Sequence, residues 1–309
     1  MAGPLHVLII SLTVAVSAYL GPMVLDYLLI TSQLSSQLAS FNFPFLSSKS
    51  SSEASTGGCL PHSYTTQLVS LDPLLIYIHN FVSAAESASI IAAGVPLLAA
   101  SPITGAGSDT VAPQTRTSLS APLPSNHATV SCILARAESF MGTLFLPGRD
   151  DMGVAQLVQY TDTQKFDLHR DWFARPRLLD TDAAAGRKRL YNRLATLFVV
   201  LRAEGIEEGS GETWFPLVKG IHDPPSPTQK VEGEDGENKE GLPLWREHED
   251  GGLAFKPVAG NALFWVNLFP GKNGSGDART LHAGLPVQGP AGLKTGMNIW
   301  PRTFFGPDA

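Results

Sequence analysis

Two histidines and one aspartate are the residues of this 309-residue chain best suited to chemistry. His169 and Asp171 stand two positions apart, and His282 follows far downstream. Side chains at positions i and i+2 of a strand point to the same face, so one strand could present both groups to one metal ion. A second histidine would complete a 2-His-1-carboxylate set, which suits non-haem Fe(II) and leaves coordination positions open. A structural zinc site would have none open.

The His-x-Asp spacing alone is weak evidence, because His248-Glu249-Asp250 has it too. That second copy lies among charged residues, Gly and Pro, with no strand-forming run beside it. His169 is flanked instead by apolar and aromatic segments at 156–160 and 172–173. We therefore expect His169 to belong to the metal-binding copy. If these two residues are considered without the rest of the sequence, an alternative is that His169 is a packed core residue and Asp171 pairs with a nearby arginine.

Further blocks of sequence surround these residues in a distinctive order. They are Tyr160 before the His-x-Asp string, Arg193-Leu194-Ala195-Thr196, Ser210-Gly211-Glu212-Thr213-Trp214-Phe215-Pro216, Phe255–Phe264, and Leu281-His282-Ala283-Gly284-Leu285-Pro286-Val287 followed by Lys294. In these blocks the chain resembles the prolyl 4-hydroxylase family of Fe(II)/2-oxoglutarate dioxygenases, over roughly residues 70–305.

The resemblance implies a set of site residues and no catalytic residue beyond the metal centre. The implied iron ligands are His169, Asp171 and His282, and the implied 2-oxoglutarate-binding residues are Tyr160, Thr196 and Lys294. Lys294 would pair with the distal carboxylate of 2-oxoglutarate. Arg279 or Arg302 could supply that cation instead, because Lys294 lies twelve residues after His282, further than the family pattern has it. The segment Gly211-Glu212-Thr213 is expected to form a structural turn.

The resemblance also implies a fold and an activity. The fold would be α+β and β-rich, a double-stranded β-helix or jelly roll with helices packed outside. The activity would be hydroxylation of peptidyl proline with O2, releasing succinate and CO2 from 2-oxoglutarate, with ascorbate as reductant. The partner would be a proline-containing peptide or protein. Two alternatives stay open: a dioxygenase acting on another amino acid or a small metabolite, and a membrane-tethered binding module without turnover.

Composition disfavours nucleic acid as a partner, and the N-terminal residues suggest a cellular location. A net charge of −6 and a pI near 5.7 disfavour nucleic-acid binding. Residues 1–30 are largely apolar, which predicts a signal-anchor or a cleaved signal peptide. A Ser-rich linker at 31–66 would precede a dioxygenase domain at 67–309. We expect the protein in the secretory pathway, in the endoplasmic reticulum membrane or lumen.

Several local features predict elements of this domain. A strand is expected at 74–78, and Ser83 with Glu86 forms a capping-box pattern that opens a helix. A second helix is expected at about 128–141. Cys132 lies in that helix and could pair with Cys59 or simply be buried. Residues 219–252 are rich in acidic residues, Gly and Pro, which predicts a flexible insertion.

Overall fold

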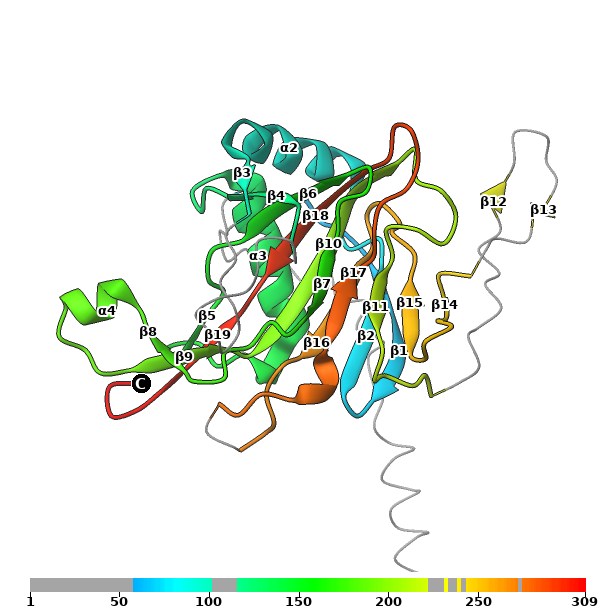
Figure 1. Ribbon diagram of the computed structural model, residues 1–309. Helices are drawn as coiled ribbons and strands as arrows, with labels where there is room; N and C mark the ends of the chain where they lie inside the picture. The colour runs from blue at the N-terminus through cyan, green and yellow to red at the C-terminus, as the bar shows by residue number, and fades with distance from the viewer. Residues whose placement is uncertain (1–57, 102–115, 222–230, 233–237, 240–242, 272–273) are drawn as a thin grey trace, which may run out of the picture. The chain divides into compact units, whose positions relative to one another are not determined.

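The computed structural model describes residues 58–101, 116–221, 231–232, 238–239, 243–271 and 274–309 (Figure 1). The predicted N-terminal apolar segment at 1–30, and most of the predicted linker, lie outside these residues. Within the described ranges, no helix combines the length and the apolar character needed to cross a membrane.

The largest element is an antiparallel sheet of eight strands. In spatial order they are β1 (Thr65–Leu71), β2 (Leu74–His79), β16 (Ala262–Val266), β10 (Ala195–Glu204), β18 (Leu293–Ile299), β6 (Gln156–Thr161), β4 (Leu119–Pro122) and β3 (Ala99–Ala100). Strand β2 confirms the strand predicted at 74–78.

Strand β10 lies at the centre of this sheet and is buried on both faces. Its apolar run alternates with the two-residue period of a strand. Leu197, Val199 and Leu201 belong to one hydrophobic cluster, whereas Phe198 and Val200 belong to the other. The run is continuously apolar because each face of β10 has its own layer to pack against.

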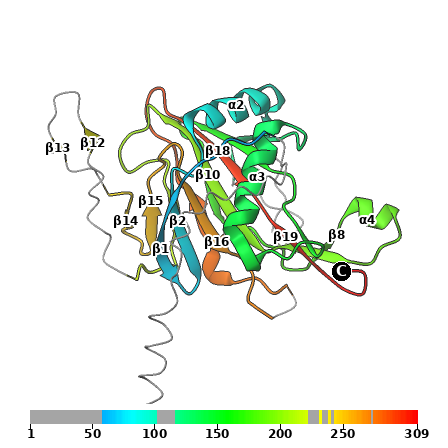
Figure 2. The same ribbon diagram turned by 180° about the vertical axis from the view of Figure 1, so that it is seen from behind.

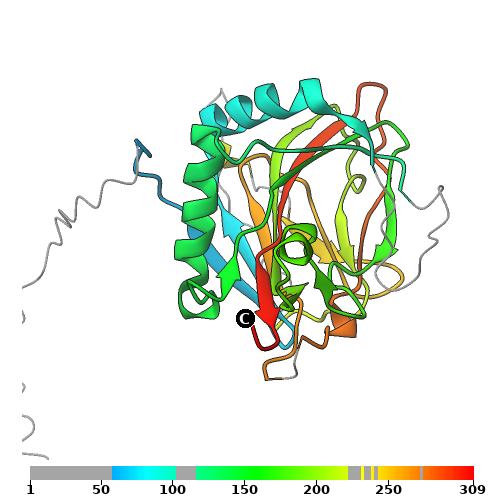
Figure 3. The same ribbon diagram turned by 90° about the vertical axis from the view of Figure 1, so that its left-hand side faces the viewer.

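Two helices cover one face of the large sheet (Figures 2 and 3). Helix α2 (Ala84–Gly94) starts at the predicted capping box, in which Ser83 and Glu86 bond each other's backbone amides. Helix α3 (Ala128–Met141) confirms the second predicted helix. Ile90 and Ile133 are fully buried in the cluster formed with the sheet. The short 3-10 helices are η1 (Val95–Leu97), η3 (Gly142–Leu144) and η4 (Ala278–Thr280).

A second antiparallel sheet packs on the opposite face. In order its strands are β14 (Trp245–Glu247), β15 (Leu253–Phe255), β11 (Thr213–Phe215), β17 (His282–Gly284) and β7 (Phe166–His169). Phe215 packs against Trp265 of the large sheet, with ring centroids 5.1 Å apart, and Phe255 packs against Tyr77. Two facing antiparallel sheets with outer helices agree with the expected β-rich, jelly-roll-like fold.

Smaller elements complete the described chain. A four-stranded sheet, in the order β5, β19, β9, β8, extends beside the two main sheets with helix α4 (Figure 1). The bounds are β5 (Asp150–Asp151), β19 (Arg302–Phe305), β9 (Leu190–Arg193), β8 (Arg177–Leu178) and α4 (Asp180–Ala184), and a separate pair is formed by β12 (Val231–Glu232) and β13 (Asn238–Lys239).

The predicted insertion at 219–252 extends too far toward its C-terminal end. Strand β14 pairs with β15 as part of the second sheet, and Trp245 is buried there. The turn between them contains Gly252, where a Cβ atom would lie 2.0 Å from the carbonyl oxygen of Phe215. Charge and glycine content suggested an unstructured segment, but here the glycine permits a tight hairpin.

Cys59 and Cys132 form a disulfide with a sequence separation of 73 residues. The spacing of the two cysteines left this pairing open. The bond ties the segment that precedes β1 to helix α3.

We expect a Cys59→Ala/Cys132→Ala variant to be less stable by roughly 2–4 kcal/mol, because the unfolded chain regains the freedom of a long loop. Urea denaturation followed by tryptophan fluorescence measures the change. Wild-type protein unfolded with reductant should reach the midpoint of the variant. Equal midpoints for the variant and the oxidised wild type would contradict the prediction.

Candidate metal centre and adjoining pocket

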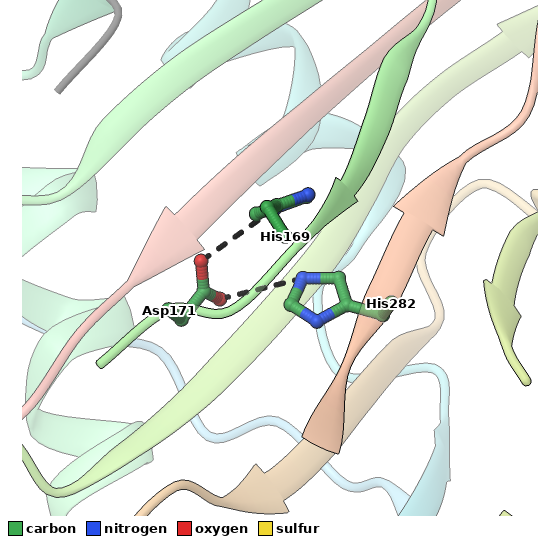
Figure 4. Close-up of side chains that lie close together, drawn as sticks. All are labelled: His169, Asp171 and His282. Atoms are coloured by element: carbon green, nitrogen blue, oxygen red, sulfur yellow. Dashed lines mark ion pairs between the residues drawn. The ribbon is translucent and has the colours of Figure 1, made fainter. Parts of the chain in front are cut away.

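The pairing of β7 with β17 brings two distant histidines together. His282 lies opposite His169 in the register of these strands. Asp171 follows β7 and completes the group, in which one ligand atom from each residue lies within 4.8 Å of the others (Figure 4). Asp171 and His282 are buried, and His169 is partly buried. The structure thus brings together the three residues expected to bind iron.

The i, i+2 spacing predicted that one strand presents both His169 and Asp171, but Asp171 lies outside the strand. Strand β7 ends at His169, and Asp171 lies in the bend that follows. Its backbone carbonyl accepts a hydrogen bond from Arg193 Nη1 at 3.1 Å. Its carboxylate accepts one from Thr196 Oγ1 at 2.8 Å. The chain leaves the sheet here because its polar partners are on strands of other sheets.

Backbone carbonyls select the tautomer of both histidines. His169 Nδ1 lies 2.8 Å from the oxygen of Asp167, and His282 Nδ1 lies 2.9 Å from that of Thr280. A carbonyl oxygen can only accept, so each Nδ1 carries the proton and the Nε2 of each neutral ring keeps its lone pair. These Nε2 atoms lie 3.7 and 3.6 Å from the two carboxylate oxygens of Asp171 (Figure 4).

The charges of the site suit a cation. Burial lowers the pKa of His169 to about 3, and neighbouring His282 acts in the same direction. Burial alone would raise the pKa of Asp171, but His282 and His169 in their protonated forms, together with Arg193, bring it down to about 2. Near neutral pH, His169 is therefore uncharged and Asp171 ionised. Nitrogen lone pairs that converge on a carboxylate repel one another, and a divalent metal ion between them would relieve this repulsion.

Aromatic rings fix the orientation of both imidazoles. Phe166 stacks on His169 with ring centroids 3.5 Å apart. Phe215 and Trp265 pack against His282 at 5.2 and 4.8 Å. This packing leaves the rings little freedom to turn away from Asp171.

The second His-x-Asp copy also has an aromatic contact, but its Asp250 is exposed, and it is not part of a group of three or more potential metal ligands within the described chain. His248 stacks on Trp214 in the hairpin between β14 and β15, and its Nδ1 accepts from the amide of Asp250 at 3.1 Å. Within the described chain, the one group of three or more potential metal ligands is that of His169. The geometry therefore favours the copy that contains His169 as the metal site, as expected from the sequence.

Lys294 lies in the same pocket as the three ligands, at a register position opposite Tyr160. Its Nζ donates to the carbonyl of Gly211 at 2.6 Å and to Thr213 Oγ1 at 3.4 Å. Burial lowers the pKa of Lys294 to about 7, with Glu212 acting in the opposite direction. The alternative cations lie elsewhere: Arg279 pairs with Asp277, and Arg302 pairs with Asp151.

Thr213 was expected in a structural turn, but it lies in β11 with its side chain lining the pocket. The neighbouring Glu212 points to a different partner, Arg246, at 2.7 Å. Glu212 precedes β11, which begins at Thr213. Other residues that line the pocket are Arg116, Phe198, Asn298 and Trp300.

Thr196 was expected to line the co-substrate pocket, and the structure places it differently. It is fully buried and is not among the residues that line the pocket. Its hydroxyl instead contacts Asp171, and Asn267 Nδ2 donates to the same hydroxyl oxygen at 2.9 Å. A sequence motif can place such a residue near the site, but it does not show whether the side chain contacts the metal ligand Asp171 or lines the co-substrate pocket.

A larger, more open pocket shares Trp300 with the inner one. Its cavity volume is about 410 Å³, against about 40 Å³ for the inner pocket. Apolar residues, among them Leu97 and Val154, line it together with Arg193 and Arg302.

The chain is similar in sequence to proteins named prolyl 4-hydroxylases. No family model matches the chain. It is 31% identical over 143 residues to probable prolyl 4-hydroxylase 7 of Arabidopsis thaliana, covering 46% of this chain and 36% of that protein. It is 27% identical over 229 residues to prolyl 4-hydroxylase 5 of the same plant, covering 72% and 66%. The chain thus spans less than two thirds of the length of these relatives.

Solved structures give similar names. The viral collagen prolyl hydroxylase of Paramecium bursaria Chlorella virus-1, in its 2-oxoglutarate complex, has a TM-score of 0.48 and 24% identity, covering 74% of this chain and 96% of that one. A Pseudomonas putida prolyl-4-hydroxylase has a TM-score of 0.41 and 15% identity, covering 78% and 93%. The curated homologues of this chain are prolyl 4-hydroxylases, which confirms the resemblance found in the sequence motifs.

Lys294 should make the stability of the ligand-free protein depend on pH. Its pKa of about 7 in the folded protein is below its ordinary value of 10.5, so the folded state binds fewer protons than the unfolded state between these pH values. The cost of burying the charged ammonium is complete below pH 7 and disappears as the pH approaches 10.5. Relative to wild type, Lys294→Met should therefore be most stable at pH 6 and lose this advantage at higher pH.

Thermal unfolding midpoints at pH values from 6 to 10 measure this trend. Lys219→Met, which removes an exposed lysine, is the matched control and should show no such slope. A constant difference between Lys294→Met and wild type across this range would contradict the assignment.

Proposed function

We propose that this chain is an Fe(II)- and 2-oxoglutarate-dependent dioxygenase that hydroxylates proline in peptides. The observation that carries the proposal is one pocket that holds His169, Asp171 and His282 at one position and the buried cation of Lys294 at another. The similarity to plant prolyl 4-hydroxylases supports the choice of proline as substrate.

His169, Asp171 and His282 would hold the iron. Two imidazoles and one carboxylate are the donor set that non-haem Fe(II) prefers, and their convergence within 4.8 Å fits a single ion. When bound, the iron would supply the redox chemistry that activates O2. The protein keeps both histidines in the tautomer that offers Nε2, through the carbonyls of Asp167 and Thr280.

Lys294 would bind the distal carboxylate of 2-oxoglutarate. Its ammonium is buried and makes its two hydrogen bonds to uncharged oxygens, so an incoming carboxylate would give it the counter-charge that it lacks. Tyr160 and Thr213 line the same pocket and offer hydroxyl groups to that carboxylate. In the overall reaction 2-oxoglutarate loses CO2, and one oxygen atom of O2 enters succinate while the other enters the substrate.

The walls of the inner pocket would keep water away from the reacting centre. Phe166, Phe198 and Trp265 supply apolar surface around the ligands. The open pocket beyond Trp300 would offer apolar residues, such as Leu97 and Val154, to prolyl rings. A proline-containing segment could therefore enter through the open pocket and place one ring at the inner one.

We also infer that the protein works in the secretory pathway, in the membrane or lumen of the endoplasmic reticulum. The disulfide between Cys59 and Cys132 supports an oxidising compartment. The apolar segment at 1–30 is long enough for a signal-anchor or a signal peptide. Ascorbate would serve as the reductant that keeps the iron in the Fe(II) state.

Purified protein supplied with Fe(II), ascorbate and 2-oxoglutarate should release succinate faster when a proline-rich peptide is added. His282→Ala should lower this rate by at least about 100-fold, because a metal ligand is lost. The measurements are succinate by coupled assay and hydroxyproline by mass spectrometry.

His248→Ala is the matched control, because it removes a histidine from the other His-x-Asp copy and should retain activity. Peptide-independent succinate would indicate another substrate. A folded, iron-loaded protein that produces no succinate with any substrate would favour a binding module without turnover.

The proposed location makes a separate prediction. In eukaryotic cells the tagged full-length chain should co-fractionate with endoplasmic reticulum membranes or lumen, and its two cysteines should resist maleimide labelling until reductant is added. A soluble cytosolic protein with freely labelled cysteines would contradict this location.

A further inference from the structure

A chain of buried side chains leads away from Asp171. Thr196 Oγ1 donates to Asp171 Oδ2 at 2.8 Å, and Asn267 Nδ2 donates to Thr196 Oγ1 at 2.9 Å. Asp171 is 5% exposed, and Thr196 and Asn267 are both 0% exposed. Bulk water does not reach Thr196 or Asn267, so the Thr196 hydroxyl takes both of its partners from the protein, whereas Asn267 Oδ1 has no partner among the described residues.

The direction of every hydrogen bond in this chain is determined. An ionised carboxylate can only accept, so the single hydroxyl hydrogen of Thr196 points at Asp171. The hydroxyl oxygen of Thr196 can then only accept, and the amide nitrogen of Asn267 supplies the donor. Replacing Thr196 or Asn267 by an apolar residue of similar shape would therefore remove an identified hydrogen bond from this chain of side chains.

Asn267 is itself held at both ends of its backbone. It follows the last residue of β16, and its N–H donates to the carbonyl of Leu194 at 2.9 Å. Its carbonyl accepts from the amide of Asp277 at 2.8 Å.

The connection continues from Asp277 to a second ligand. The carbonyl of Asp277 accepts from Thr280 Oγ1 at 2.8 Å, and the carbonyl of Thr280 accepts from His282 Nδ1 at 2.9 Å. Asn267 is therefore linked by hydrogen bonds to Asp171 on one side and to His282 on the other.

We propose that Thr196 and Asn267 are positioning residues of the metal centre, which fix the rotation of the Asp171 carboxylate. The hydrogen bond from Thr196 holds Oδ2 in place, and with the carboxylate in this rotation each oxygen lies beside one histidine Nε2. This inference rests on the proposed iron site. It differs from the role expected for Thr196 in the sequence, because the residue acts on the metal ligand and not on 2-oxoglutarate.

A purely structural role would have a different signature. The hydrogen bond from Thr196 joins strand β10 of the large sheet to the bend after β7 of the second sheet, so its loss lowers stability in either case. Metal affinity separates the two roles, because a structural link would change the unfolding midpoint without changing the affinity of the protein that remains folded.

The experiment is anaerobic titration of the full-length protein with Co(II), followed by calorimetry and by the visible absorption of the bound ion. Thr196→Val should weaken Co(II) binding about 10–100-fold, as is typical when a partner of a metal ligand is lost. Thr196→Ser keeps the hydroxyl and should bind like wild type. Thr303→Val, which removes a buried hydroxyl on β19, should also bind like wild type.

Asn267→Leu gives an independent second variant, because it removes the donor to Thr196 without touching the carboxylate's own partner. We expect its Co(II) affinity to fall about tenfold. Folded Thr196→Val or Asn267→Leu protein that binds Co(II) within about twofold of wild type would overturn the positioning role. Wild-type protein that binds neither Co(II) nor Fe(II) would overturn the proposed function itself, together with this inference.

Discussion

The structure of the site depends on one buried negative charge. Asp171 is 5% exposed, and an isolated carboxylate at that depth would cost several kcal/mol. Thr196 donates to it from the large sheet, the two imidazoles approach it from β7 and β17, and Arg193 binds its backbone. The hydroxyl of Thr196 and the positive charge of Arg193 stabilise this carboxylate, and the hydrogen bond from Thr196 also links the two sheets at this end of the fold.

Charge balance then relates the two ligands of the proposed reaction. A divalent iron would add two positive charges beside Asp171, and 2-oxoglutarate would add two negative ones, of which the proposed function places one at Lys294. Binding of either ligand alone would change the net charge of the buried pocket, whereas binding of both would leave it unchanged. Because interactions between charges are strong where water is excluded, each ligand should favour binding of the other.

The sequence predicted the parts of this arrangement that have local causes. The capping box at Ser83 and the strand predicted at 74–78 depend on neighbouring residues, and both have the expected form. The position of Asp171 in a bend, the contact of Thr196 with it and the pairing of Cys59 depend on residues far away in the chain. Trp245 is a similar case, because a short strand in a charged segment forms only where a neighbouring strand, β15, accepts it.

The two His-x-Asp strings show what a motif needs in order to become a site. Both have the same spacing, and both histidines stack on an aromatic ring. His169 lies at the end of a strand that pairs with β17, and this register supplies a second imidazole 113 positions later in the sequence. His248 lies in a hairpin turn beside a 73% exposed Asp250, where solvent already satisfies the carboxylate. Burial of the aspartate, and a partner strand that brings a histidine, distinguish the candidate metal centre from its copy.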